Sequence, residues 1–209
     1  MILPAIVLPP REAPLVLNWP DAGSPVATMT FATPDAWRAF VTRLSLNPGV
    51  PAVTRLKYER AQKLFLLGWI DADLIKSAEL VALTALELAL RDRFAHTVPP
   101  VGAGKPAAAP RKAVAASPAR RSFKALLRHL VDGEGLTDDQ IPVIARCGGA
   151  AIGQLTGATS PDLAERRNAM AHGDPFDGLP TGGLVELVRD LIEFAYRGHL
   201  TSHTGGAAR

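Results

Sequence analysis

The chain has one short polar stretch whose residue types could do chemistry, ERRNAMAHG at residues 165–173. It combines two arginines, an amide and a histidine, which are groups that can bind an anion and move a proton near neutral pH. Ser160-Pro161-Asp162 is a favourable helix start, and Gly173 is a favourable stop. The polar groups are therefore predicted to lie at the end of a helix over 160–172.

The geometry of that helix limits how the polar groups can act together. Asn168 and His172, four residues apart, share a face. Arg167 and His172, five apart, differ by about 140° around a regular helix. They converge only if the helix distorts near its end or if two copies of the motif meet across a symmetry axis. The alternative is that His172 caps the helix and the arginines are solvated.

Other catalytic signatures are missing from the sequence. GAGK at 102–105 lacks the spacing of a phosphate-binding loop, and no dinucleotide fingerprint or Cys-x-x-Cys pair occurs. His199 and His203 stand four apart but have no third ligand beside them. The single Cys147 lies in an apolar stretch and is expected to pack. We therefore expect no metal and no cofactor.

The elements that would position these polar groups are predicted to be mainly α and to form a bundle of four to five helices. Long apolar helices are expected over 58–68 and 71–94, where apolar residues in the second recur at spacings of three and four. Further helices are expected over 122–131, from the capping box at 137–140, and over 181–196.

The two ends of the chain differ from this bundle. Two β-prone runs, 14–19 and 26–31, flank a turn, and Thr33-Pro34-Asp35 is a helix start. Residues 1–52 are thus predicted to form a small α+β N-terminal appendage to a helical domain over 53–198. Residues 199–209 are expected to be a disordered tail.

A basic segment interrupts the helical domain. Residues 98–121 are rich in Pro, Ala, Gly, Lys and Arg without apolar periodicity, which predicts a flexible loop. No acidic residue occurs from 93 to 131. The segment is either a solvated loop or an electrostatic contact to the phosphates of a nucleic acid. Its candidate RNA-binding residues are Lys105, Arg111, Lys112, Arg120 and Arg121.

RNAMAHG at 167–173 resembles the R-N-x-x-x-H signature of HEPN domains. These are small all-helical domains common in microbial toxin–antitoxin systems, defence systems and CRISPR effector nucleases. The run over 79–94 resembles the long HEPN helix that precedes the signature and often carries an acidic residue facing it. The resemblance covers about residues 56 to 197, so the first 50 residues lie outside it.

The resemblance implies metal-independent RNA cleavage, in which the 2′-OH of the RNA attacks and leaves a cyclic phosphate and a 5′-OH. His172 would act as acid or base, and Arg167 would stabilise charge on phosphorus. Asn168 would orient His172 or hold a phosphate oxygen. Glu87 would hold Arg167 or take part in proton transfer, with Glu79 as the alternative; either glutamate could instead form a structural ion pair.

The family pattern also bears on RNA contacts and assembly. Arg91, one turn beyond Glu87, would extend the positive patch or pair with Glu87, and Arg166 is a further RNA-binding candidate. HEPN domains usually form two-fold dimers that bring both signatures into one cleft, which predicts a homodimer.

The predicted function is a metal-independent endoribonuclease, the toxin of a toxin–antitoxin or anti-phage module, with RNA and a cognate antitoxin protein as partners. The alternative is a non-catalytic HEPN-like module that binds RNA, a nucleotide or a protein.

The 209 residues carry a net charge of +3, which does not itself indicate a nucleic-acid partner. Hydrophobic residues make up 47%, which excludes global disorder. No run of about 18 apolar residues occurs, so a cytoplasmic protein with no membrane contact is expected.

Overall fold

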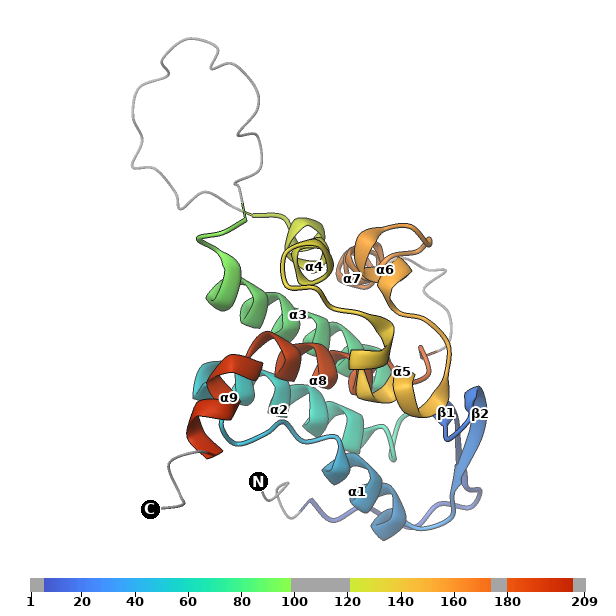
Figure 1. Ribbon diagram of the computed structural model, residues 1–209. Coiled ribbons are helices and arrows are strands. Elements are labelled where there is room, and N and C mark those ends of the chain that lie inside the picture. The colour runs from blue at the N-terminus through green and yellow to red at the C-terminus, as the bar shows by residue number, and fades with distance from the viewer. Residues whose placement is uncertain (1–5, 99–120, 174–179, 205–209) are drawn as a thin grey trace, which may run out of the picture.

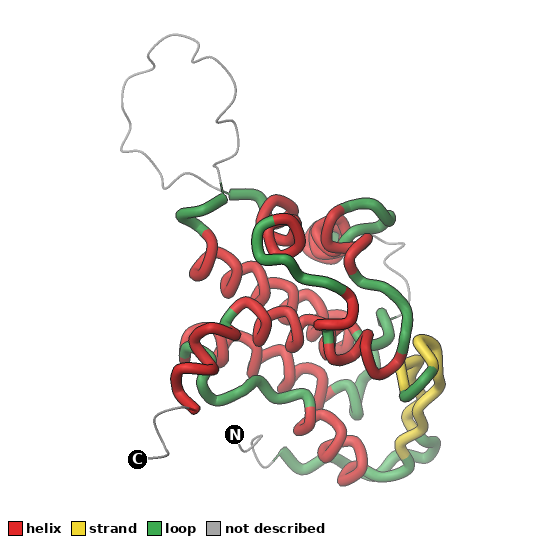
Figure 2. The backbone as a smooth tube through the Cα atoms, viewed as in Figure 1, coloured by secondary structure: helices red, strands yellow, loops and turns green. Residues whose placement is uncertain are grey.

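The computed structural model describes residues 6–98, 121–173 and 180–204, and this part is mainly helical with one small antiparallel sheet (Figures 1 and 2). In chain order the elements are β1 (Leu15–Asp21), β2 (Ser24–Phe31), α1 (Pro34–Arg43), α2 (Ala52–Leu67), α3 (Leu74–Phe94), α4 (Phe123–Asp132), the 3₁₀ turn η1 (Asp138–Gln140), α5 (Pro142–Cys147), α6 (Ile152–Thr156), α7 (Leu163–His172), α8 (Leu184–Ala195) and α9 (Arg197–Thr204).

Helix α3 lies at the centre of the bundle. It packs against α2 and α8 on one side and against α4 and α7 on the other (Figure 1). Alanines at 78, 82, 85 and 89 are fully buried and let the neighbouring helices approach closely. Two carboxylates of α3, Glu79 and Glu87, are buried as well. This central helix therefore carries charge into the interior, where each carboxylate needs a partner.

The N-terminal segment is joined to the helical body by aromatic packing. Strands β1 and β2 pair antiparallel, with Leu15 opposite Phe31. The ring of Trp19 lies 5.6 Å from that of Phe65 on α2, and Trp37 on α1 lies 5.0 Å from the same ring. The expected α+β elements are present, and their buried residues share one hydrophobic core with those of the helices.

Several helix ends follow the expected local signals. Thr33, Ser122 and Asp162 each accept a hydrogen bond from the first turn of the helix that follows. The capping box at 137–140 is also present, but it starts only the three-residue turn η1. Pro142 explains the difference, because the residue before a proline avoids helical backbone and Ile141 is extended.

The C-terminal end differs from the sequence prediction. The tail expected from residue 199 is helical through Thr204, and Leu200 packs against the core. Residues 205–209 lie outside the described part. Of the nine α-helices of the described ranges, α1 is the helix expected after Thr33 in the N-terminal segment. The other eight exceed the predicted bundle of four to five because α5, α6 and α9 add short helices.

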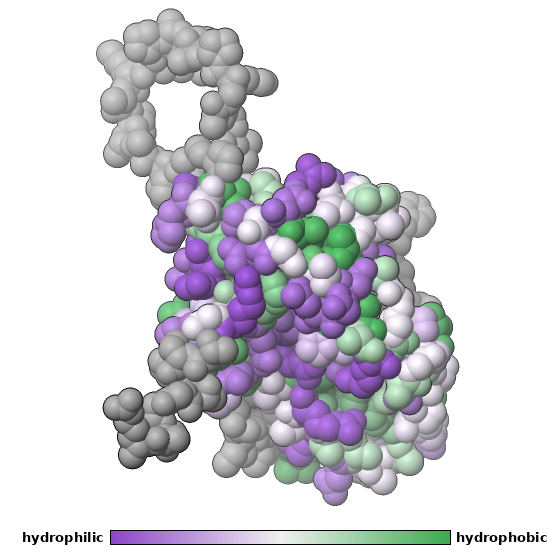
Figure 3. All heavy atoms as spheres, in the orientation of Figure 1, coloured by the Kyte–Doolittle hydropathy of each residue, from purple (hydrophilic) through white to green (hydrophobic). Residues whose placement is uncertain are grey.

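Polar side chains dominate the face seen in Figure 3, and apolar atoms appear there only in small patches. This distribution follows from the burial of the large apolar side chains in the single core. Within the described ranges, no helix is both long and apolar enough to cross a bilayer.

Candidate functional site: a cationic groove between α3, α4 and α7

A groove of about 480 Å³ opens where α3, α4 and α7 meet. Four cationic side chains line it: Arg91 from α3, Arg121 and Lys124 from the start of α4, and Arg167 from α7. The acidic residues of its wall are Glu87, Asp162 and Glu165, and Asn168 contributes an amide. Two of these carboxylates, Glu87 and Asp162, are buried, so the accessible surface of the groove is enriched in cations.

Glu87 holds two arginines at the groove. Its Oε2 accepts a hydrogen bond from the guanidinium of Arg167, and its Oε1 lies 2.6 Å from NH2 of Arg91. The Glu87 side chain is 7% exposed, whereas that of Arg91 is 48% exposed. Arg167 also donates to Oδ1 of Asn168 at 2.9 Å, and its guanidinium lies 6.0 Å from the ring of Phe123. Arg167 is therefore fixed on three sides.

Glu87, not Glu79, is the acidic residue of α3 that faces the signature helix. Glu79 lies eight residues earlier, about two helical turns away. Its Oε1 accepts a hydrogen bond from the backbone N–H of Thr181 at 2.6 Å, and its Oε2 lies 3.3 Å from Nζ of Lys76. The sequence left both glutamates open, and the contacts of the folded chain assign the Arg167 pairing to Glu87.

Asp162 and Lys124 connect the groove to the start of α7. Oδ1 of the buried Asp162 accepts from the N–H of Glu165 at 2.8 Å, and the Glu165 side chain accepts from the N–H of Asp162 in return. Oδ2 of Asp162 lies 2.6 Å from Nζ of Lys124. Burial alone would raise the pKa of Asp162, but the Lys124 and backbone hydrogen bonds lower it below its ordinary value.

His172 stands apart from the other signature residues within one chain. Helix α7 stays regular to His172 and ends at Gly173, whose φ of 68° is left-handed. The distortion that would turn His172 toward Arg167 is thus not present. His172 is exposed and is not among the residues that line the groove. Asn168 is exposed and does line it.

The remaining RNA-binding candidates divide into three groups. Arg91 and Arg121 line the groove as expected. Arg166 does not: its guanidinium donates to Oγ1 of Thr181, at 3.3 Å, on another side of α7. Lys105, Arg111, Lys112 and Arg120 lie outside the described residues.

Two groove residues were missed as site residues by sequence reasoning. Lys124 lies in the stretch 93–131 that lacks acidic residues but was not chosen as a candidate, and Asp162 was noted only as part of a helix start. Their contact joins positions 38 apart in the chain, so no local pattern reports it. The described residues contain no group of three or more His, Cys, Asp or Glu able to hold a metal ion.

Comparison with protein-family models, with curated proteins and with solved structures finds no match to this chain. The resemblance to HEPN domains therefore rests on the residues of the signature and on the long preceding helix.

Proposed function

We propose that this chain is a metal-independent endoribonuclease of the HEPN type that cleaves RNA by attack of its 2′-OH. The observation that carries the proposal is the buried Glu87 of α3, which holds Arg167 at the wall of a cationic groove. Arginine remains protonated at all physiological pH values and its fork matches the oxygens of a phosphodiester. Arg167 held in this way is preorganised to stabilise charge that develops on phosphorus.

The proton transfers are assigned to His172. The imidazole would take the proton of the attacking 2′-OH or give one to the leaving 5′-oxygen. Because α7 is regular, His172 lies about 140° around the helix from Arg167. A second copy placed across a two-fold axis would bring its own His172 to this groove, which is why we include a homodimer in the proposal.

The cations of the groove would serve substrate binding. Arg91, Arg121 and Lys124 can contact the phosphates on either side of the scissile bond, since such contacts bind the backbone without reading the bases. A ribonuclease of this kind suits the toxin of a toxin–antitoxin or anti-phage module, which a cognate antitoxin protein would restrain.

The decisive experiment incubates the purified full chain with end-labelled single-stranded RNA in excess EDTA. We expect fragments ending in a cyclic phosphate, and a loss of rate of about 100-fold or more in His172→Ala. His96→Ala is the matched control, because His96 is also exposed but follows the end of α3. Undiminished cleavage by His172→Ala, or an absolute metal requirement, would refute the proposal.

A second candidate is a non-catalytic HEPN-like module that binds RNA, a nucleotide or a protein. The position of His172 outside the groove favours it. It predicts that labelled RNA binds, by fluorescence anisotropy, with an affinity that falls in Arg91→Ala but not in His172→Ala, and that no fragment forms.

A further inference from the structure

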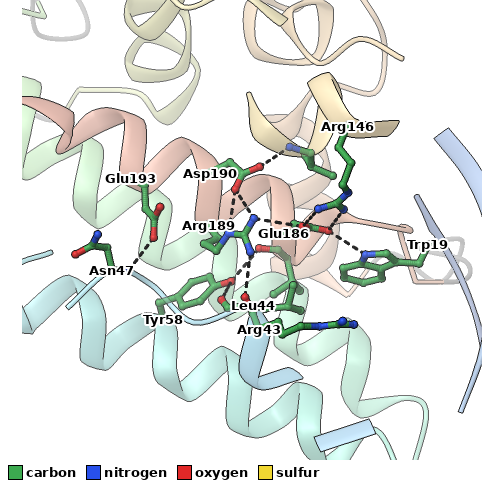
Figure 4. Close-up of polar contacts among 12 residues, drawn as sticks. Trp19, Arg43, Leu44, Asn47, Tyr58, Arg146, Glu186, Arg189, Asp190 and Glu193 are labelled. Carbon is green, nitrogen blue, oxygen red and sulfur yellow. Dashed lines mark hydrogen bonds and ion pairs between the residues drawn. The ribbon is translucent and has the colours of Figure 1, made fainter. Parts of the chain in front are cut away.

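A second charged cluster lies on the buried face of α8, away from the groove. Glu186 and Asp190 are each 4% exposed. Glu186 accepts two hydrogen bonds from Arg146 of α5, at 2.9 and 3.0 Å, and one from the indole N–H of Trp19 at 3.1 Å (Figure 4). Burial opposes ionisation of Glu186, but these donors lower its pKa below the ordinary value. The carboxylate is thus charged and holds the Arg146 guanidinium in place.

Arg189 forms the floor of the cluster. Its guanidinium donates to Oδ1 of Asp190 at 2.9 and 2.7 Å, to Oε1 of Glu186 at 3.2 Å and to the backbone carbonyl of Arg43 at 3.1 Å. Asp190 also accepts from the N–H of Val143 at 2.8 Å. These contacts use most of the five N–H groups of Arg189, so its role is to fix the surrounding side chains.

A cavity of about 300 Å³ opens beside this cluster and shares no lining residue with the α3–α4–α7 groove. Three arginines and two carboxylates make up the charged residues that line it. They are Arg43, Arg146, Arg189, Asp21 and Glu186. Its apolar lining comes from β1, β2, α1 and the residue after α1. These apolar residues are Trp19, Pro20, Met29, Phe40 and Leu44.

Two of the three arginines retain donors for a ligand. An arginine has five N–H groups, and Glu186 takes two of those of Arg146. The Arg43 guanidinium lies 5.6 Å from the Phe40 ring, and its side chain is exposed. Figure 4 shows Arg43 on the same side of Arg189 and Glu186 as Trp19. The cavity therefore offers two guanidinium groups with unused donors beside an apolar wall, and Glu186 holds one of them, Arg146, in place.

We propose that this cavity binds a small organic anion, namely a carboxylate or phosphate monoester joined to an apolar body of about the size of one ring. A guanidinium fork favours an anionic oxygen pair, and Arg43 and Arg146 supply two such forks. The apolar body would pack on Met29, Phe40 and the Trp19 edge. The buried Glu186 makes the site selective for a single anionic group, because a second negative charge would face its carboxylate.

The test follows the indole N–H resonances by two-dimensional NMR while phenyl phosphate or benzoate is added to the full chain. Trp19 reports the cavity, because its indole donates to Glu186. The chain has only two other tryptophans. Trp69 donates to the carbonyl of Pro9 and is the internal reference, whereas Trp37 stacks on Phe40, 5.6 Å away, and is not used as one. We expect a saturable shift of the Trp19 resonance with at least one of the two probes, and none of the Trp69 resonance.

Two variants and two control compounds complete the test. Arg43→Met keeps the side-chain stem over Phe40 but loses the fork, and we expect it to weaken binding about tenfold. Arg60→Met, at an exposed position of α2, should bind as the wild type does. If benzyl alcohol binds as tightly as the anionic probes, the requirement for an anionic group is wrong. If inorganic phosphate binds as tightly, the requirement for an apolar body is wrong. An unmoved Trp19 resonance, or unchanged affinity in Arg43→Met, would overturn the site itself.

Discussion

Glu87 is the residue on which the candidate active site depends most. A carboxylate buried to 7% exposure is costly unless it is paired, and here Arg167 and Arg91 supply the pairing. In Glu87→Gln one of the two carboxylate oxygens becomes an NH2 group, which cannot accept a hydrogen bond from an arginine. We expect a loss of about 1 to 3 kcal/mol in the free energy of unfolding in urea, with the smaller share from the half-exposed Arg91. RNA cleavage should fall at least about tenfold, because Arg167 is no longer held.

Glu79→Gln is the matched control for this change. Glu79 lies on the same helix and is also buried, but its partners are the N–H of Thr181 and the ammonium of Lys76, not Arg167. We expect this variant to lose stability by a similar amount and to keep its cleavage rate. Full cleavage by Glu87→Gln, or an equal loss in both variants, would contradict the role assigned to Glu87.

The sequence predicted this site in part. That an acidic residue of the long helix would face the signature was predicted from the resemblance to HEPN domains, which left Glu87 and Glu79 as alternatives. The choice against Glu79 was not predictable, because both glutamates lie on the buried part of α3 and only the packing of α7 separates them. The contact between Lys124 and Asp162 depends on how α4 and α7 meet, which no spacing along the chain encodes.

At the scale of elements, α7 is stabilised by a cap that depends on pH. A carboxyl whose pKa is lowered in the folded state contributes stability above its unfolded pKa, about 3.9, and loses it as the pH falls through the folded value. Asp162 is such a group. Lys124→Met removes the side-chain cause of the lowering and leaves the burial. The free energy of unfolding in urea should therefore be lower at pH 7 in this variant, and it should fall less on acidification than that of the wild type, over a series from about pH 7 to 3.

Arg128→Met is the control for this pH dependence. Arg128 lies one turn further along α4, and its ion pair with Asp132 joins two exposed side chains 4.0 Å apart. Such a pair contributes little to stability, so the variant should keep the wild-type pH profile. A profile of Lys124→Met that coincides with that of the wild type would show that Lys124 does not govern the cap.

The elements themselves were predictable where a local signal decides them. Asp162 and Gly173 bound α7 as expected, since a capping side chain and a left-handed glycine act within one turn. Helix α9 was missed because its sequence is rich in Gly, Thr and Ser, and its order depends on Leu200 packing against the core. Tertiary packing overrides weak propensity in such segments.

For the whole molecule, one hydrophobic core extends across the change of composition near residue 52. Trp19, Trp37 and Phe40 needed an apolar surface to cover, and α2 provides it through Phe65. Hydrophobic burial thus joined the α+β part to the helices. Packing within one chain does not complete the candidate site in the same way, because Arg167 lines the groove and His172 does not.

Assembly is the step that would complete the groove, and it can be tested by mixing inactive variants. In gel filtration the purified chain should elute at an apparent mass of twice the 22.1 kDa of one copy.

The mixing experiment uses two variants. Arg167→Ala and His172→Ala should each be nearly inactive alone. After subunit exchange, mixed dimers keep one Arg167 and one His172 on opposite copies. Cleavage of labelled RNA should then rise well above that of either variant, because the 140° between the two side chains favours action across the axis. A monomer, or a mixture no more active than its parts, would place both groups in one copy and contradict the composite site.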